Sequence, residues 1–354
     1  MSLLRRHWPL IGPALIVVLL ALAGTLTSRS LQLQARSILV TAAIVISLHV
    51  FIGNSGVISF GHISFVGVGA FAAGLATAPA DLKPTAFPDM LPFLAQLEVG
   101  NLASLALAAV LGGLFAYLVG VPIMRLSGLA AGIATFAVLI ITNNVFRNWE
   151  AIGPGAKTLP QVPETSDFVQ VTVGLLLVLG VAYLYQQSKH GRMLRAARED
   201  PAAAQSSGVD IHSQRLVAFT LSGAMAGFAG ALFVHLIGSI TTNQVFLDLT
   251  FITLAMLVIG GLGSLWGAVI GALFIATLNS ALFEAENGLE LGSIMIDLPT
   301  GSRLLGLALV MLAVLLFRPQ GITSGKELRW PFDRDRLAPP SQREPVASDQ
   351  LPES

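Results

Sequence analysis

The sequence predicts an all-α polytopic membrane protein with about ten transmembrane helices. Its 354 residues are 54% hydrophobic and only 11% charged, with a mean hydropathy of +0.76, which excludes a water-soluble globular protein of this length. The apolar residues also gather into stretches long enough to cross the ~30 Å hydrocarbon core as helices. The basic residues, finally, collect in alternate connections between these stretches.

The candidate spans, in chain order, are 9–26, 37–52, 60–78, 99–121, 128–146, 168–186, 216–237, 249–263, 265–283 and 303–317. The two spans that meet at Gly260, Gly261 and Gly263 are short, so one of them is alternatively a re-entrant segment shielded by protein. The first span has a second interpretation as a cleavable signal peptide, because Arg5 and Arg6 precede its apolar core.

The distribution of basic residues predicts the orientation. With a cytoplasmic N-terminus, the outer connections keep only Arg29, Arg36, Lys83, Arg147 and Lys157. The inner segments then hold Arg5, Arg6, Arg125, Lys189, Arg192, Arg195, Arg198, Arg215, Arg318, Lys326, Arg329, Arg334, Arg336 and Arg343. By the positive-inside rule, both termini and the loop between Lys189 and Arg215 are cytoplasmic.

The chain is therefore divided into three parts. Residues 1–36 form an N-terminal segment with the first transmembrane helix, residues 37–321 form the membrane domain with a cytoplasmic loop at 187–215, and residues 322–354 form a polar, disordered cytoplasmic tail. The absence of cysteine excludes disulfides and thiolate sites, and a net charge of zero gives no attraction for nucleic acid. His49, His62 and His235 are too scattered to predict a metal site.

The loop at 187–215 is the most informative polar segment. Residues 191–199 predict a short helix, Pro201 begins another turn, and Gly208 is a plausible stop. Small side chains between charged ones suit a helix that docks on a soluble partner. The alternative is an ordinary solvated loop that is basic only because of the membrane topology.

The sequence also predicts that the energy source lies outside this chain. No Asp or Glu lies deep inside a candidate span, whereas proton-coupled pumps generally need such a carboxylate. The nearest approach to a phosphate loop is GITSGKE at 321–327, but its spacing is short and Glu327 stands where Ser or Thr must bind magnesium.

Four ordered motifs resemble the LivM-type permease subunit of branched-chain amino acid ABC importers. They are the loop elements Gly191-Arg192, Arg195-Ala196, Arg198-Glu199-Asp200, Ala203-Ala204 and Gly208-Val209; the segments at 216–230 and 258–271; the Gly-x-x-Ser-x-Gly-His core at Gly56, Ser59, Gly61 and His62; and the closing FRPQG at 317–321. The resemblance spans most of residues 35–321.

This resemblance implies an importer assembled from several proteins. It implies a second, LivH-type permease subunit, two cytoplasmic ATPase subunits that bind ATP and Mg²⁺, and an extracytoplasmic substrate-binding protein, all at a bacterial plasma (inner) membrane. This chain itself is then no enzyme and binds no cofactor. The loop residues that the resemblance assigns to the ATPase contact are Gly191, Arg192, Arg195, Ala196, Glu199, Asp200, Ala203 and Gly208.

Glycines and polar residues inside the spans have two interpretations each. Glycines at four-residue intervals, as in Gly263, Gly267 and Gly271, Gly223 and Gly227, or Gly128 and Gly132, favour close helix packing. Gly53, Gly56 and Gly61, and Gly260, Gly261 and Gly263, can instead break helices and expose backbone to substrate. The candidates for a substrate path are Asn54, Ser59, His62, Ser64, Thr135, Asn143 and Asn144, although each of them could simply satisfy a neighbouring helix.

The substrate stays open because residues 136–157 depart from the family pattern. No acid occurs at 137–142, and the later turn reads Gly153-Pro154-Gly155. Branched-chain or related hydrophobic amino acids are the first expectation, and urea or short-chain amides are the alternative within the superfamily. A secondary carrier or channel that is not driven by ATP is the alternative from another class.

Overall fold

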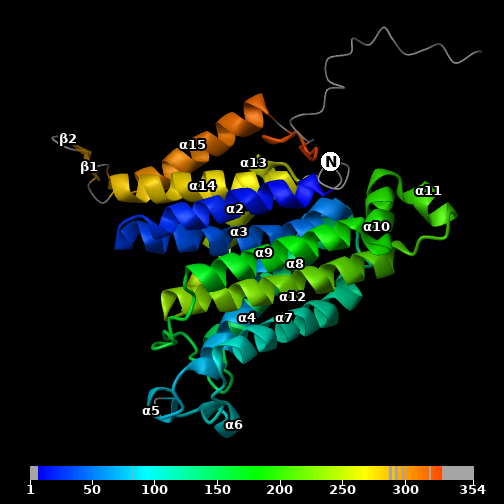
Figure 1. Cartoon of the computed structure of the whole chain (residues 1–354). Coiled ribbons are helices and arrows are strands. Elements are labelled where there is room, and N and C mark those ends of the chain that lie inside the picture. The colour runs from blue at the N-terminus through cyan, green and yellow to red at the C-terminus, as the bar shows by residue number, and fades with distance from the viewer. Residues whose placement is uncertain are drawn as a thin grey trace, which may run out of the picture.

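The structure is a computed structural model that describes residues 7–81, 83–286, 289–291, 294–296, 299, 301–318 and 320–328. These residues form a bundle of helices that run roughly along one direction, joined by short helices and loops at its two ends (Figure 1). The prediction of an all-α polytopic membrane protein is confirmed. Arg5, Arg6 and the chain from Arg329 onward lie outside the described residues.

Each predicted span corresponds to one helix. These helices are α2 (Trp8–Thr25), α3 (Arg29–Ser55), α4 (His62–Thr77), α7 (Asn101–Ile123), α8 (Gly128–Asn148), α9 (Phe168–Gln187), α12 (Ile211–Ile237), α13 (Leu247–Gly260), α14 (Leu265–Glu286) and α15 (Ser302–Phe317). The shorter elements are α5 (Lys83–Ala86), α6 (Pro92–Ala95), α10 (Lys189–Glu199), α11 (Pro201–Ser206), the 3-10 turn η1 (Thr242–Val245), and the strands β1 (Leu289–Leu291) and β2 (Ile294–Ile296), which pair antiparallel.

Within the described residues, eight helices have the length and composition needed to cross a bilayer, with α13 counted together with η1. The apolar helices α4 and α15 are shorter. Several boundaries differ from the prediction by three residues or more: α3 begins at Arg29, inside the expected N-terminal segment, and α14 continues to Glu286, beyond its predicted end at residue 283. Helix α12 begins at Ile211 instead of residue 216. Gln34 on α3 donates a hydrogen bond of 2.6 Å to Glu284 on α14, which joins the extensions of α3 and α14.

Helix α12 lies at the centre of the bundle, packed on α3, α4 and α7. Gly227 approaches α7 so closely that a Cβ there would collide with the carbonyl of Ala108, and a Cβ on Gly223 would collide with Ala116. The predicted packing role of this pair is confirmed, as it is for Gly267 and Gly271 between α13 and α14. The predicted packing role is wrong for Gly128, which has a positive φ of 55° and open space around it.

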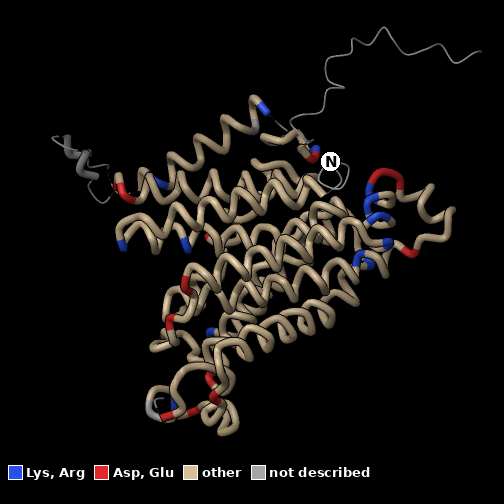
Figure 2. The backbone as a smooth tube through the Cα atoms, in the orientation of Figure 1, with Lys and Arg blue, Asp and Glu red and all other residues tan. Residues whose placement is uncertain are grey.

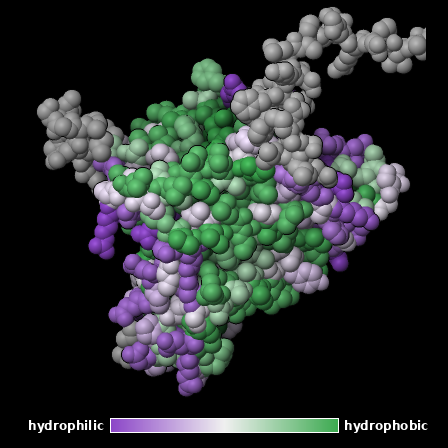
Figure 3. Space-filling model, viewed as in Figure 1, coloured by the Kyte–Doolittle hydropathy of each residue, from purple (hydrophilic) through white to green (hydrophobic). Residues whose placement is uncertain are grey.

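The outer face of the bundle is apolar along its middle and polar at its ends (Figure 3). Leu102 on α7, Leu129 on α8 and Leu184 on α9 are among the large apolar side chains that remain exposed. Lys and Arg gather most densely around α10 and the start of α12 (Figure 2). The start of α2 and residues 320–328 lie at this same end, called here the α10 end, whereas α5 and α6 lie at the other (Figure 1).

Candidate functional site

The first glycine break separates α3 from α4. Helix α3 ends at Ser55, and Gly56 follows with a φ of +71°, a conformation that costs a non-glycine residue about 1–2 kcal/mol. Residues 56–61 are then irregular until α4 begins at His62. The Ser222 hydroxyl lies 2.8 Å from Nε2 of His62 and donates to the carbonyl of Ser47 at 2.5 Å. Ser47 precedes the end of α3 by about two turns, so the irregular segment folds back into the bundle.

The second break separates α13 from α14 and lies against the first. Helix α13 ends at Gly260, and Gly261 has a φ of +116° before α14 begins at Leu265. A Cβ on Gly53 would stand 2.7 Å from the carbonyl oxygen of Leu262. The prediction that these two glycine groups interrupt helices is confirmed, and the structure adds that they meet. We call residues 53–56 and 260–264 together the break junction.

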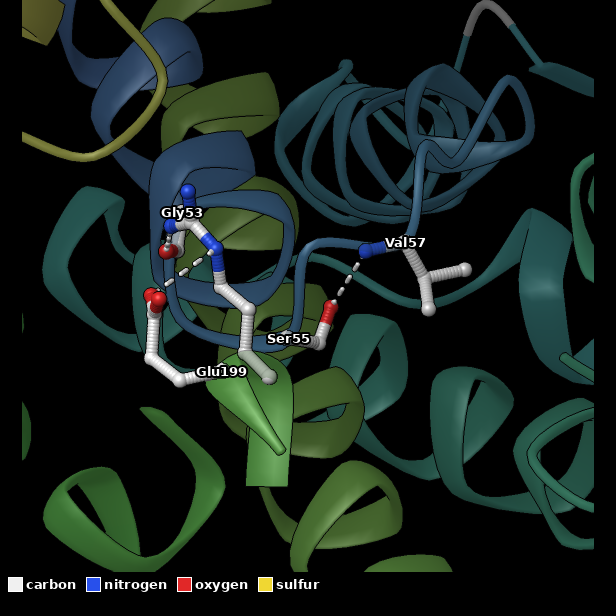
Figure 4. Close-up of polar contacts among 5 residues, drawn as sticks. Gly53, Ser55, Val57 and Glu199 are labelled. Atoms are coloured by element: carbon white, nitrogen blue, oxygen red, sulfur yellow. Dashed lines mark hydrogen bonds and ion pairs between the residues drawn. The ribbon is translucent and has the colours of Figure 1, made fainter. Parts of the chain in front are cut away.

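Arg198 on α10 holds the first half of this junction. Its guanidinium Nη1 donates a hydrogen bond of 2.6 Å to the carbonyl oxygen of Gly53, near the end of α3 (Figure 4). The stem of Arg198 crosses Gly56, where a Cβ would lie only 2.9 Å from Cγ. The carboxylate of Glu199 is 4.0 Å from Nε of the same guanidinium. The last carbonyls of a helix have no partner within the helix, so Arg198 also satisfies one of them.

Each of the two short helices of the polar loop begins at a capping side chain. Ser188 accepts from the backbone N–H of Gly191 at 3.1 Å and begins α10. Asp200 accepts from the N–H groups of Ala202 and Ala203, each at 3.0 Å, and begins α11 ahead of Pro201. Gly208, with a φ of +81°, follows the end of α11. The predicted helix at 191–199, the restart at Pro201 and the stop near Gly208 are therefore confirmed.

The loop residues assigned to a partner contact divide into two groups. Those with exposed positions are Arg192, Ala196, Glu199, Asp200, Ala203 and Gly208. Gly191 is buried, and a Cβ there would collide with the carbonyl of Tyr185. Arg195 is also turned inward, because its Nη2 donates to the carbonyl of Gln186 at 2.7 Å. These two residues fix α10 on α9 instead of facing outward.

Residues 322–327, which the sequence assigned to the disordered tail, are bound to the second half of the junction. The N–H of Ile322 donates to the carbonyl of Ile259 at 2.7 Å, and the Thr323 hydroxyl donates to that of Gly260 at 2.9 Å. Glu327 accepts from the N–H of Leu265 at 2.8 Å. Burial raises the pKa of Glu327, while its hydrogen bonds at the start of α14 and the nearby charge of Arg195 act in the opposite direction.

The predicted substrate-path residues do not form one cluster. Ser64 and Asn143 share a small cavity of about 10 Å³ between α4, α8 and η1 with Thr142 and Thr242. The hydroxyls of Ser64 and Thr142 are buried there without a hydrogen-bond partner. The Ser59 hydroxyl is likewise buried and without a partner.

Three other candidates have local partners. Thr135 accepts from the N–H of Phe60 at 3.2 Å and holds the irregular segment on α8. Asn54 donates within its own helix to Val50. Asn144 is exposed on α8 and also donates within its helix, so it does not face the cavity.

The sequence did not predict the contacts of three residues of the site. Arg198 binds the end of α3, Glu327 binds the start of α14, and Gln186 joins α9 to α3. Gln186 lies with its Nε2 2.9 Å from Nε2 of His49, which joins α9 to α3 beside the junction. Among the described residues no group of three His, Asp or Glu side chains is arranged to hold a metal ion. The chemistry of the site is thus one of backbone carbonyls and N–H groups held by charged side chains.

Known relatives match between 40% and 78% of this chain. It is 34% identical over 160 residues to the probable branched-chain amino acid transport permease protein LivH of Methanocaldococcus jannaschii, covering 44% of this chain and 47% of the relative. It is 24% identical over 313 residues to the high-affinity branched-chain amino acid transport system permease protein LivM of Escherichia coli K12, covering 78% and 66%. It is 30% identical over 149 residues to the autoinducer 2 import system permease protein LsrC of Photorhabdus laumondii, covering 40% and 41%.

The chain thus spans between about two fifths and two thirds of the length of these curated relatives. No solved structure matches it. The family described as the branched-chain amino acid transport system, permease component, matches residues 30–317. This match covers most of the chain, including both glycine breaks and α10. The chain belongs to the branched-chain amino acid transport permease family and is a permease subunit of its LivM type.

Proposed function

We propose that this chain forms the translocation path of an ATP-binding cassette importer for branched-chain or related hydrophobic amino acids in a bacterial inner membrane. In this proposal both termini are cytoplasmic, and the chain pairs with a LivH-type permease subunit. Two cytoplasmic ATPase subunits bind the ATP and Mg²⁺, and an extracytoplasmic protein delivers the substrate. The apolar outer face is the surface for lipid and for the second permease subunit (Figure 3).

One observation carries the proposal: the hydrogen bond from Arg198 to Gly53. It connects α10, whose neighbour α11 offers the exposed Ala202 and Ala203 at one end of the bundle, with a helix break inside it. A soluble partner that displaces α10 would pull on the end of α3 through this bond. A secondary carrier has no use for such a link, since its driving ion binds within the membrane domain.

The ATPase contact is tested at its exposed alanines. Ala203→Glu and Ala196→Glu place a carboxylate on the proposed contact without touching the internal bonds of Arg195. We expect both to abolish co-purification of the ATPase subunits. The matched control is Thr158→Glu, which adds the same charge to an exposed position in the loop before α9, at the opposite end. Equal loss of the ATPase in the control would contradict the proposed contact.

The substrate is tested by uptake into proteoliposomes that carry the full complex. ATP-dependent accumulation of leucine, urea, ribose and autoinducer 2 is compared; the last is included because LsrC relatives are named for it. We expect leucine to accumulate and urea to stay at its equilibrium level. Accumulation of any solute against its gradient without ATP hydrolysis would overturn the whole proposal in favour of a secondary carrier.

A further inference from the structure

An apolar groove lies beside the small cavity that Ser64 and Thr142 line. The groove has a volume of about 350 Å³ and lies between α4, α6, α7 and α8. Thr142 and Phe146 line both spaces, so the small cavity and the groove are neighbours. The volume of the groove falls within the range of about 300–1,000 Å³ that is usual for small-molecule sites.

The groove has the dimensions and the lining of a site for a short aliphatic group. Its walls include Phe71 and Leu75 of α4 and Phe115 of α7, and among the described residues that line it Thr142 is the only polar one. From Val68 to Leu75, α4 contributes about 10 Å of wall. This length is less than half of the ~30 Å hydrocarbon core, whereas the acyl chains of one leaflet fill half of that core. The groove therefore fits a branched side chain better than a lipid chain.

The small cavity supplies hydrogen-bonding groups that the fold itself leaves unused. Ser64 is 1% exposed and Thr142 is 7% exposed, and neither hydroxyl has a partner. By contrast, the hydroxyls of Thr77, Thr250 and Thr253 donate to carbonyls of their own helices at 2.8, 2.9 and 2.7 Å. A buried hydroxyl without a partner is costly, so a polar ligand group that binds both hydroxyls is stabilised.

A primary ammonium group matches this small cavity. Its volume of about 10 Å³ gives room for roughly one water-sized group. Both hydroxyls can accept hydrogen bonds, and the carbonyl of Thr242, another lining residue, accepts from Asn143 at 3.2 Å with only one of its two lone pairs. That carbonyl repels a carboxylate, whereas an ammonium group has three donors to offer. None of the described residues that line the two spaces is charged, so binding is weak enough for release.

We propose that the two spaces form one solute subsite, in which the small cavity binds the ammonium group of an α-amino acid and the groove takes its branched aliphatic side chain. The proposal rests on the proposed function and adds which part of the chain binds which part of the solute. Leu94 of α6 lines the groove, and α6 lies at the end of the bundle opposite α10 (Figure 1). In the proposed orientation this end is extracytoplasmic, which is the side from which the solute arrives.

Photolabelling of the full complex in proteoliposomes tests the location of the subsite. The probe is a leucine analogue that carries a diazirine in its side chain, and the labelled residues are identified by mass spectrometry. We expect labels on groove residues such as Phe71, Phe115 and Ile141 that excess leucine removes and equal aspartate does not. Labels only elsewhere, or labels that leucine leaves unchanged, would overturn the proposal.

A second probe tests the lipid alternative. It is a phospholipid that carries a diazirine in its acyl chain. We expect leucine to reduce any labelling of the groove by this probe. Labelling of the groove by the lipid that leucine does not displace would show a lipid site and overturn the proposal.

The ammonium contact is tested with a matched probe that lacks the amino group. We expect it to label the groove at least threefold less than the leucine analogue. Thr142→Val should reduce labelling by the leucine analogue by about two- to tenfold and leave labelling by the matched probe unchanged. Thr77→Val, which removes a hydroxyl that has a partner, is the control and should change neither. Equal labelling of the wild type by both probes would contradict the ammonium contact.

The side-chain contact is tested by filling the groove. Ala72 lines the groove, so Ala72→Leu should reduce labelling by the leucine analogue at least threefold. Ala106→Leu adds the same side chain at an exposed position of α7 and should have no effect. Equal labelling of both variants would show that the groove does not hold the side chain.

The outcomes separate this proposal from the proposed function. ATP-driven leucine uptake by a complex whose groove is never labelled would overturn the subsite and leave the importer intact. A complex whose groove is labelled, but which accumulates leucine without ATP hydrolysis, would overturn the proposed function and leave the subsite intact.

Discussion

Arg198 and Gly53 are far apart in the sequence, yet the guanidinium of one donates a 2.6 Å hydrogen bond to the carbonyl oxygen of the other. A hydrogen bond to a charged group is worth about 1.5–3 kcal/mol, more than a neutral one. This hydrogen bond ends on α3, which stops inside the bundle next to the break between α13 and α14. The loop that is exposed at one end is therefore bonded directly to the last turn of α3, next to the irregular residues 56–61.

Gly56→Ala should weaken this contact and destabilise the protein. The new Cβ would meet Cγ of Arg198 at 2.9 Å, and the φ of +71° costs alanine about 1–2 kcal/mol. Thermal unfolding in detergent measures the change. Gly128→Ala is the matched control, because Gly128 also has a positive φ but has open space around it. A larger effect in the control would show that the contact with Arg198 is not tight.

Asp200 should act as a helix cap and not as a charged contact. Asp200→Asn keeps an acceptor for the N–H groups of Ala202 and Ala203, whereas Asp200→Ala loses it at a cost of about 0.5–2 kcal/mol. We expect the Asn variant to bind the ATPase subunits normally and the Ala variant to bind them weakly, measured by co-purification. Equal loss in both variants would instead indicate a direct ionic contact with the partner.

Gly227→Ala should disrupt the packing of α12 on α7. The added methyl group would collide with the carbonyl of Ala108, and overpacking of this kind typically costs about 1–3 kcal/mol. Gly180→Ala on α9 has nothing within 4 Å and should be neutral or slightly stabilising. The melting temperatures of the two variants are compared. Equal temperatures would contradict close backbone contact between α7 and α12.

The buried hydroxyls of Ser64 and Thr142 should affect substrate affinity more than stability. Neither has a hydrogen-bond partner, so Ser64→Ala and Thr142→Val remove no internal bond. If they serve the substrate, loss of one hydrogen bond raises KM by about two- to tenfold. The control is Thr77→Val, which removes a hydroxyl that donates at 2.8 Å within its own helix. A KM that is unchanged in all three variants would show that the small cavity is not part of the substrate path.

The sequence predicted those parts of the fold that depend on local chemistry. Apolar length located the ten helices that correspond to the predicted spans. Pro201 and Gly208 lie where α11 begins and beyond where it ends, as predicted. The glycine breaks could be located because only glycine adopts such backbone angles freely. The packing role predicted for Gly128 is wrong, because a four-residue interval does not reveal whether a helix actually packs against that face.

The links between distant residues could not be predicted in this way. Arg198 and Glu327 bind backbone groups, and a carbonyl or N–H gives no sequence signal of its own. The polarity of residues 322–327 suggested a tail, but their partners are the unpaired ends of α13 and α14. Asn144 was grouped with Asn143 by adjacency, although neighbouring residues on a helix point about 100° apart.

The most direct test of the account is simultaneous measurement of ATP hydrolysis and leucine uptake in proteoliposomes that carry the full complex with Arg198→Gln. The account predicts that hydrolysis continues while uptake falls by about tenfold or more, because a bond of about 1.5–3 kcal/mol between α10 and α3 is lost. Lys189→Gln, which removes an exposed charge at the start of the same helix, should keep both activities. Wild-type uptake per ATP in Arg198→Gln would contradict the account.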